Sequence, residues 1–172
     1  MLSPALFYGG FEFAANLIVQ QYELPRQTRN GVKHALTAAV AFKTLRQLYV
    51  ADAAAEHIIL SLGAFNEHVE TYVKVGNFDS EAEMRKDLYN NWAGIVAARW
   101  ILEQPERRDF FSTLAMLAQS GTLMLKPLPD TSPATMEAPE VSRAQGWLAA
   151  HQQQFAIQMN DALNNQSRPR QK

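Results

Sequence analysis

The chain has 172 residues, a formal net charge of −1, 47% apolar residues and 19% charged residues. These values are typical of a single globular domain with a buried core and argue against a disordered or fibrous chain. The balanced charge provides no basic surface, so we expect no nucleic-acid partner. The absence of cysteine excludes a disulfide scaffold, a thiol nucleophile and a cysteine-ligated metal.

Membrane and export signals are weak in this sequence. No apolar run approaches the roughly 20 residues that cross a bilayer, so we expect no transmembrane segment. The first 25 residues lack a positively charged start and a clean apolar block, and they therefore make a poor secretory signal. If the protein leaves its cell, we expect a route other than a general signal peptide.

The first half of the chain has helical periodicity, and no window reads as a strand. The first predicted helix covers 4–22 and is ended by Pro25. The second covers 31–50, and its first half is apolar or small almost all round, so we expect it near the centre of the domain. The third covers 52–74, with Asp52 as its N-cap. The apolar stripe of this third helix consists of Ile58, Leu62, Phe65, Val69 and Tyr72.

The second half continues the helical pattern. Ser80 with Glu83 forms a capping box for a fourth helix that runs through Leu102, and a fifth helix is predicted from Pro105 to about Ser120. Four prolines make 126–139 an irregular connection before the last helix. The last helix covers 140–163, and residues 166–172 form a polar tail predicted to be disordered. The sequence therefore predicts an all-α fold, a single bundle of about six helices in one domain over residues 1–165.

The fourth predicted helix carries a polar patch. Asp87, Asn90, Asn91 and Gly94 share one face of it. Packing is expected from the opposite side, through Met84, Leu88, Trp92, Ile95 and Leu102. The patch is interpreted either as a solvated surface or as a site. Two adjacent asparagines have low helix propensity, which argues against a position that is only solvent-exposed in the middle of a helix.

His34 and Glu67 are the other candidate residues. His34 opens onto an apolar face, where a histidine is more often structural than catalytic, but Asn30 lies one turn earlier and could orient its ring. Short turns should make the second and fourth helices parallel and the third antiparallel to both. At about 1.5 Å of rise per residue, His34, Glu67 and Asp87 then reach the same end of the bundle.

The order Asn30-x-x-x-His34-Ala, then Glu67, then Asp87-Leu-x-Asn90-Asn91-x-x-Gly94 resembles a bacterial family of all-helical domains found in secreted and polymorphic toxins. The resemblance covers about residues 26–100, within a core motif region of 26–104, and extends to the wider group of Wnt-like or lipocone domains. In the family, aspartate usually stands at the position of Asn30 and histidine at that of Asn66.

The resemblance implies an effector or toxin used in bacterial competition, a hydrolase or phosphotransfer enzyme acting on a phosphate-linked lipid or envelope substrate. It would be secreted without a signal peptide, act in a target cell and face a cognate immunity protein. The implied catalytic residues are His34, Glu67 and Asp87, and Glu67 and Asp87 could hold a divalent cation. The implied substrate-binding residues are Asn30, Asn66, Asn90, Asn91 and Gly94.

Two alternatives stay open. Neutral charge and the replacement of two acid–base positions by Asn30 and Asn66 favour a non-enzymatic helical module, such as an immunity protein, an adaptor or a component of a secretion system or phage. In that case the polar patch is a hydrogen-bonded core network, and the location could be cytoplasmic. The apolar first helix and the alanine-rich second helix are the only support for a membrane-disrupting toxin.

Overall fold

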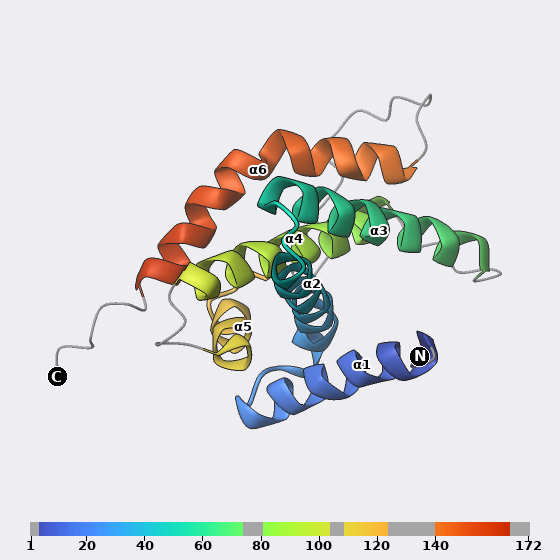
Figure 1. The fold of residues 1–172 in the computed structure, drawn as a ribbon. Coiled ribbons are helices and arrows are strands. Elements are labelled where there is room, and N and C mark those ends of the chain that lie inside the picture. The colour runs from blue at the N-terminus through green and yellow to red at the C-terminus, as the bar shows by residue number, and fades with distance from the viewer. Residues whose placement is uncertain (1–3, 74–80, 104–108, 124–139, 166–172) are drawn as a thin grey trace, which may run out of the picture.

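All regular structure in the described part of the chain is helical (Figure 1). The computed structural model describes residues 4–73, 81–103, 109–123 and 140–165, and the side chains of 9–66, 81–103, 109–123 and 142–164. Its elements are α1 (Pro4–Gln21), a short 3-10 helix η1 (Arg26–Thr28), α2 (Arg29–Gln47), α3 (Asp52–Val73), α4 (Glu81–Glu103), α5 (Phe110–Gln119) and α6 (Glu140–Asn165). The predicted all-α bundle of about six helices is confirmed. The proline-rich connection 126–139 and the tail 166–172 lie outside the described residues.

Helix α4 forms the centre of the bundle, where α2, α3, α5 and α6 pack against it, and α1 packs on α2 and α5 (Figure 1). Every residue from Met84 to Ile95 is buried, so the helix has no solvated side over three turns. The interpretation of its polar patch as a solvated surface was therefore wrong, because α2, α3 and α6 cover this helix from different sides. Leu102, which was assigned to the packing face, is 39% exposed near the end of α4. Helix α2 packs directly on α4, consistent with its predicted central place.

The closest approach between α2 and α4 is at Gly94. A β-carbon added there would lie 2.0 Å from the carbonyl oxygen of Ala35, well inside van der Waals contact. Glycine is required at this point because the two helix backbones touch. Other contacts advance along both helices in the same sense, since Asn30 meets Asp87 and Arg99 lies over the ring of Phe42. Helices α2 and α4 thus run in the same direction, as predicted.

Helix α3 runs antiparallel to α4. Near its start, Asp52 and Glu56 bind Arg99, and further along Gly63 packs against Asn91. The core side of α3 consists of small or aliphatic residues, namely Ala55, Ile59 and Ala64. The described part of the predicted apolar stripe lies on the opposite side, with Ile58 39%, Leu62 62% and Phe65 64% exposed. An amphipathic stripe normally faces the core, and here it faces solvent.

The last two helices close the bundle. Helix α5 begins at Phe110 rather than at the predicted Pro105, because the carboxylate of Asp109 accepts a hydrogen bond from the amide of Ser112 at 2.8 Å and so caps the helix. Helix α6 packs on α4 through Phe155, which contacts Tyr89 edge-on with ring centroids 4.8 Å apart. Over the described residues, no helix has the length and apolar character needed to cross a bilayer.

Candidate functional site

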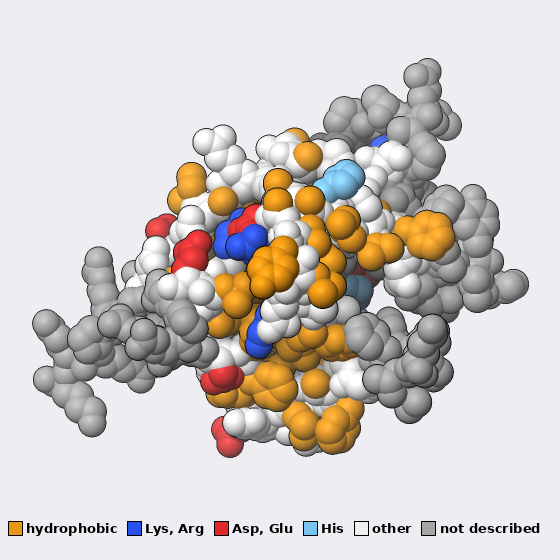
Figure 2. All heavy atoms as spheres, in the orientation of Figure 1, with side chains coloured by type: hydrophobic (Ala, Val, Ile, Leu, Met, Phe, Trp, Pro, Cys, Tyr) orange, Lys and Arg blue, Asp and Glu red, His pale blue; other side chains and the backbone are white. Residues whose placement is uncertain are grey.

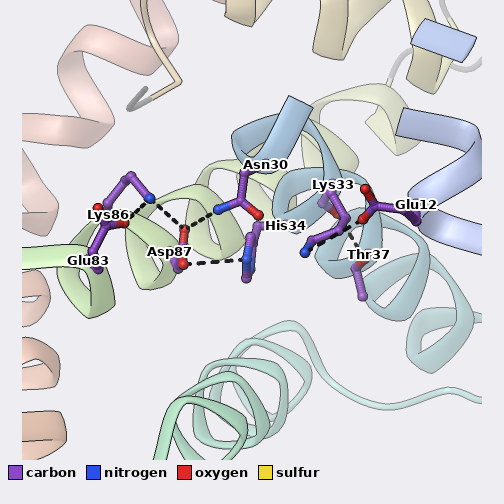
Figure 3. Close-up of polar contacts among 8 residues, drawn as sticks. All are labelled: Glu12, Asn30, Lys33, His34, Thr37, Glu83, Lys86 and Asp87. Atoms are coloured by element: carbon purple, nitrogen blue, oxygen red, sulfur yellow. Dashed lines mark hydrogen bonds and ion pairs between the residues drawn. The ribbon is translucent and has the colours of Figure 1, made fainter. Parts of the chain in front are cut away.

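Asp87 is the centre of a polar cluster between α2 and α4 (Figure 3). Its side chain is almost completely buried, with the residue only 8% exposed. The amide Nδ2 of Asn30 donates a hydrogen bond to its Oδ1 at 3.1 Å. The Nε2 atom of His34 lies 3.5 Å from its Oδ2, and Nζ of Lys86 lies 3.7 Å from its Oδ1. The carboxylate therefore contacts an amide, an imidazole and an ammonium group, which together offset the cost of burying its charge.

Local helix geometry explains why these side chains meet. Asn30 and His34 are four residues apart and project from the same face of α2, one turn above the other. Asp87 lies two turns into α4, and the parallel course of the two helices places it beside both of them (Figure 3). The predicted convergence of His34 and Asp87 is confirmed by the 3.5 Å distance between their side chains.

Lys86 is held in place from its own helix. Its ammonium group pairs with the carboxylate of Glu83, one turn earlier on α4. On the other side of the cluster, Nζ of Lys33 lies 3.8 Å from the carboxylate of Glu12 on α1. Each lysine thus has an acidic neighbour, and Asp87 lies between Lys86 and the imidazole of His34 (Figure 3).

A pocket of about 300 Å³ opens between α2 and α3 beside this cluster. Its wall is mostly apolar. The lining residues are Lys33, His34, Thr37, Ala38, Ala41, Ile59, Leu62, Gly63, Asn66 and Asn91. Asp87 is not among them, so it contacts His34 on the side away from the pocket, whereas His34 itself lines the pocket. Size and composition match those of small-molecule sites, which are largely apolar with a few polar groups.

The amide of Asn91 reaches this pocket because Gly63 leaves room for it. A β-carbon at position 63 would lie 2.7 Å from Nδ2 of Asn91, so any larger residue would displace the amide. Asn91 is 7% exposed and belongs to the central helix α4. It therefore adds a hydrogen-bonding group to a wall whose other polar side chains are Lys33, His34, Thr37 and Asn66.

The structure separates the predicted site residues into groups. Asn30, His34 and Asp87 form one cluster, and Asn66 and Asn91 line the pocket that His34 also lines. Two other residues predicted to bind substrate lie elsewhere. Asn90 is 0% exposed inside the bundle, and Gly94 is buried at the crossing of α2 and α4, outside the pocket lining.

Glu67 belongs to α3, one turn after Gly63, but its side chain lies outside the described residues. Among the side chains that are described, no three histidine, aspartate or glutamate residues gather as a metal site would require. A cation held by Glu67 and Asp87 stays a prediction.

Sequence reasoning missed the two lysines. Charged residues on amphipathic helices usually read as solvated, and neither lysine belongs to the motif. The signals were present, because Lys33 precedes His34 directly and Glu83 stands at the i, i+3 spacing from Lys86 that permits an ion pair.

Comparison of the chain with protein-family models, with curated proteins and with solved structures found no match. Function is therefore inferred from the side chains that meet at Asp87 and from the pocket beside them.

Proposed function

We propose that the protein is a bacterial secreted effector that hydrolyses or transfers a phosphate-linked group of the lipid head-group type. The effector role rests on the motif resemblance, and the observation that supports the chemistry is the arrangement of His34, which contacts a buried carboxylate on one side and lines a largely apolar pocket on the other. A base oriented by a second group is the common arrangement of acid–base and nucleophilic sites.

His34 is the reacting group in this proposal, and Asp87 positions it. A carboxylate beside Nε2 favours the tautomer that carries its proton on that nitrogen, so the lone pair resides on Nδ1. As general base, Nδ1 takes a proton from the attacking water, and the proton then passes to the leaving oxygen when the phosphate ester bond breaks. Asp87 stabilises the imidazolium formed in between, and the Asn30 amide keeps the carboxylate oriented.

The pocket supplies the binding groups. Its apolar part, Ala38, Ala41, Ile59 and Leu62, suits a hydrocarbon portion of a substrate. Lys33 brings a positive charge to the same wall as His34, as recognition of a phosphate requires, and the Asn91 amide can donate to a phosphate or ester oxygen.

The experiment is expression of the full chain in a bacterial host, directed separately to the cytoplasm and to the periplasm. The expected result is growth arrest in one compartment only, lost in His34→Ala and in Asp87→Asn. His57→Ala is the matched control, because His57 is an exposed histidine on α3 outside the pocket lining. In vitro, removal of a general base should lower phosphate-ester turnover roughly 10²–10⁴-fold.

A second candidate is the non-enzymatic interaction module. It is favoured by the hydrogen bond from Asn30 to the buried Asp87, which joins α2 to α4 and could serve only to fix helix register. In that case the wild-type chain arrests growth in neither compartment, and Asp87→Asn changes the unfolding free energy alone. Retained toxicity in His34→Ala would contradict the enzymatic proposal directly.

A further inference from the structure

The exposed apolar stripe of α3 has the spacing of a helix-pairing surface. Ile58, Leu62 and Phe65 follow one another at steps of four and three residues, which is the heptad spacing that lets two helices pack side by side. They are 39%, 62% and 64% exposed, and Figure 2 shows hydrophobic side chains standing out over α3 on this face. We call Ile58, Leu62 and Phe65 the α3 stripe.

The exposed positions of α3 whose side chains are described, up to Asn66, are uncharged. The exposed positions of this helix from 54 to 66 are Ala54, His57, Ile58, Ser61, Leu62, Phe65 and Asn66, and none is aspartate, glutamate, lysine or arginine. The acidic residues at the start of the helix, Asp52 and Glu56, bind Arg99 of α4 instead. An identical surface can therefore approach without repulsion between like charges, which normally separates copies of a soluble helix.

We propose that the α3 stripe is the interface between two copies of this chain, related by a two-fold axis. A two-fold interface pairs one patch with itself, and an uncharged apolar stripe is complementary to itself. A membrane surface fits less well, because helices that lie in the bilayer interface carry lysine and arginine along their polar side. The exposed positions of α3 from 54 to 66 have neither residue.

The size of the stripe sets the strength of the pairing. Phe65 exposes roughly 130 Å² if a phenylalanine side chain offers about 200 Å² in total. With Leu62 and Ile58 the stripe reaches about 300 Å² per chain, or about 600 Å² over two chains, so residues at its rim must also be buried to reach the lower limit of about 1,000 Å² for a specific interface. An interface of this size belongs to the weak, transient class, so we expect a dissociation constant in the micromolar range.

The interface adjoins the pocket without coinciding with it. Leu62 lines the pocket, whereas Phe65 does not, so a paired α3 lies along one rim of the opening. Phe65→Glu is therefore the primary test variant, because it adds a charge to the interface and leaves the pocket lining intact. Ile157→Glu is the matched control, since Ile157 is 60% exposed but lies on α6.

The test is sedimentation of the full chain from about 1 to 300 µM, a range that brackets the expected constant. Wild type and Ile157→Glu should change from monomer to dimer, and Phe65→Glu should dissociate roughly 100-fold more readily. Because the chain has no cysteine, Ser61→Cys should also be joined to its partner by a bis-maleimide, whereas Gln158→Cys on α6 should not.

Three outcomes overturn the proposal. The first is a wild-type chain that stays monomeric over the whole range, including one that binds phospholipid vesicles instead. The second is a dimer that persists in both Phe65→Glu and Leu62→Glu. The third is cross-linking at position 158 that equals cross-linking at position 61.

Discussion

Replacement of Gly94 by alanine should separate the two helices that carry the candidate site. The added β-carbon would lie 2.0 Å from the carbonyl oxygen, 2.7 Å from the carbonyl carbon and 2.8 Å from the α-carbon of Ala35. A carbon and an oxygen in contact stay about 3.3 Å apart, so α2 and α4 must separate by more than about 1 Å. Since backbone atoms cannot rotate away as a side chain can, the strain passes to the packing around both helices.

Two opposing effects decide the change in stability. Alanine in a helix interior is favoured over glycine by about 1 kcal/mol. Overpacking a core costs about 1–3 kcal/mol, and contact with a backbone belongs at the upper end of that range. The net loss should be about 2 kcal/mol, which for a chain of this length lowers the melting temperature by about 4–8 °C.

The assay is equilibrium unfolding in urea followed by circular dichroism. Gly146→Ala is the matched control, because Gly146 lies in α6 and a β-carbon there would meet nothing within 4 Å. That control should gain about 0.5–1 kcal/mol from helix propensity alone. Equal or greater stability of Gly94→Ala compared with wild type would refute the close crossing of α2 and α4.

Three further predictions concern single side chains. Burial by itself raises the pKa of Glu81, but hydrogen bonds from Arg143 and Arg85 outweigh this effect and hold the pKa below its usual 4.5. Since the pKa of Glu81 is lower in the folded state, the stability that Glu81 provides is complete above about pH 4.5 and is lost as pH falls further. Glu81→Gln should therefore make the urea midpoint fall less steeply as the pH is lowered. An equally steep fall in this variant contradicts the prediction. Burial raises the pKa of Tyr89 to about 12, and its hydroxyl donates to the Thr122 carbonyl at 2.8 Å. Tyr89→Phe should therefore lower the unfolding free energy by about 1 kcal/mol. In an alkaline titration followed by ultraviolet absorbance, the variant should lack the tyrosine ionisation that occurs at the highest pH, and an ionisation that persists there would exclude this assignment. Asp109→Ala removes the cap of α5 and should cost about 1 kcal/mol, measured as faster amide hydrogen exchange in the first turn of α5; exchange at the wild-type rate would show that the cap is dispensable.

The meeting of His34 and Asp87 followed from the sequence because it depends on quantities that a sequence contains, whereas the hydrogen bond of Asn30 was expected at His34 and is made to Asp87. Helix lengths and short turns fix the direction of neighbouring helices, and a constant rise per residue fixes the height of each side chain. The pocket beside His34 did not follow. Its lining, which includes Gly63 and Asn91, depends on the rotation of α2, α3 and α4 about their own axes.

Local chemistry determined the class of the fold and the order of its helices. Periodicity and proline positions express interactions between residues close in the chain, and these act almost independently of the rest of the molecule. Only the tertiary structure decided which side of each helix is buried. The asparagine side of α4 lies inside the bundle and the apolar stripe of α3 lies outside, because burial depends on how many neighbours surround a helix. A helix covered from several directions buries polar groups that find partners, whereas a helix at the edge leaves apolar residues exposed even when their spacing is regular.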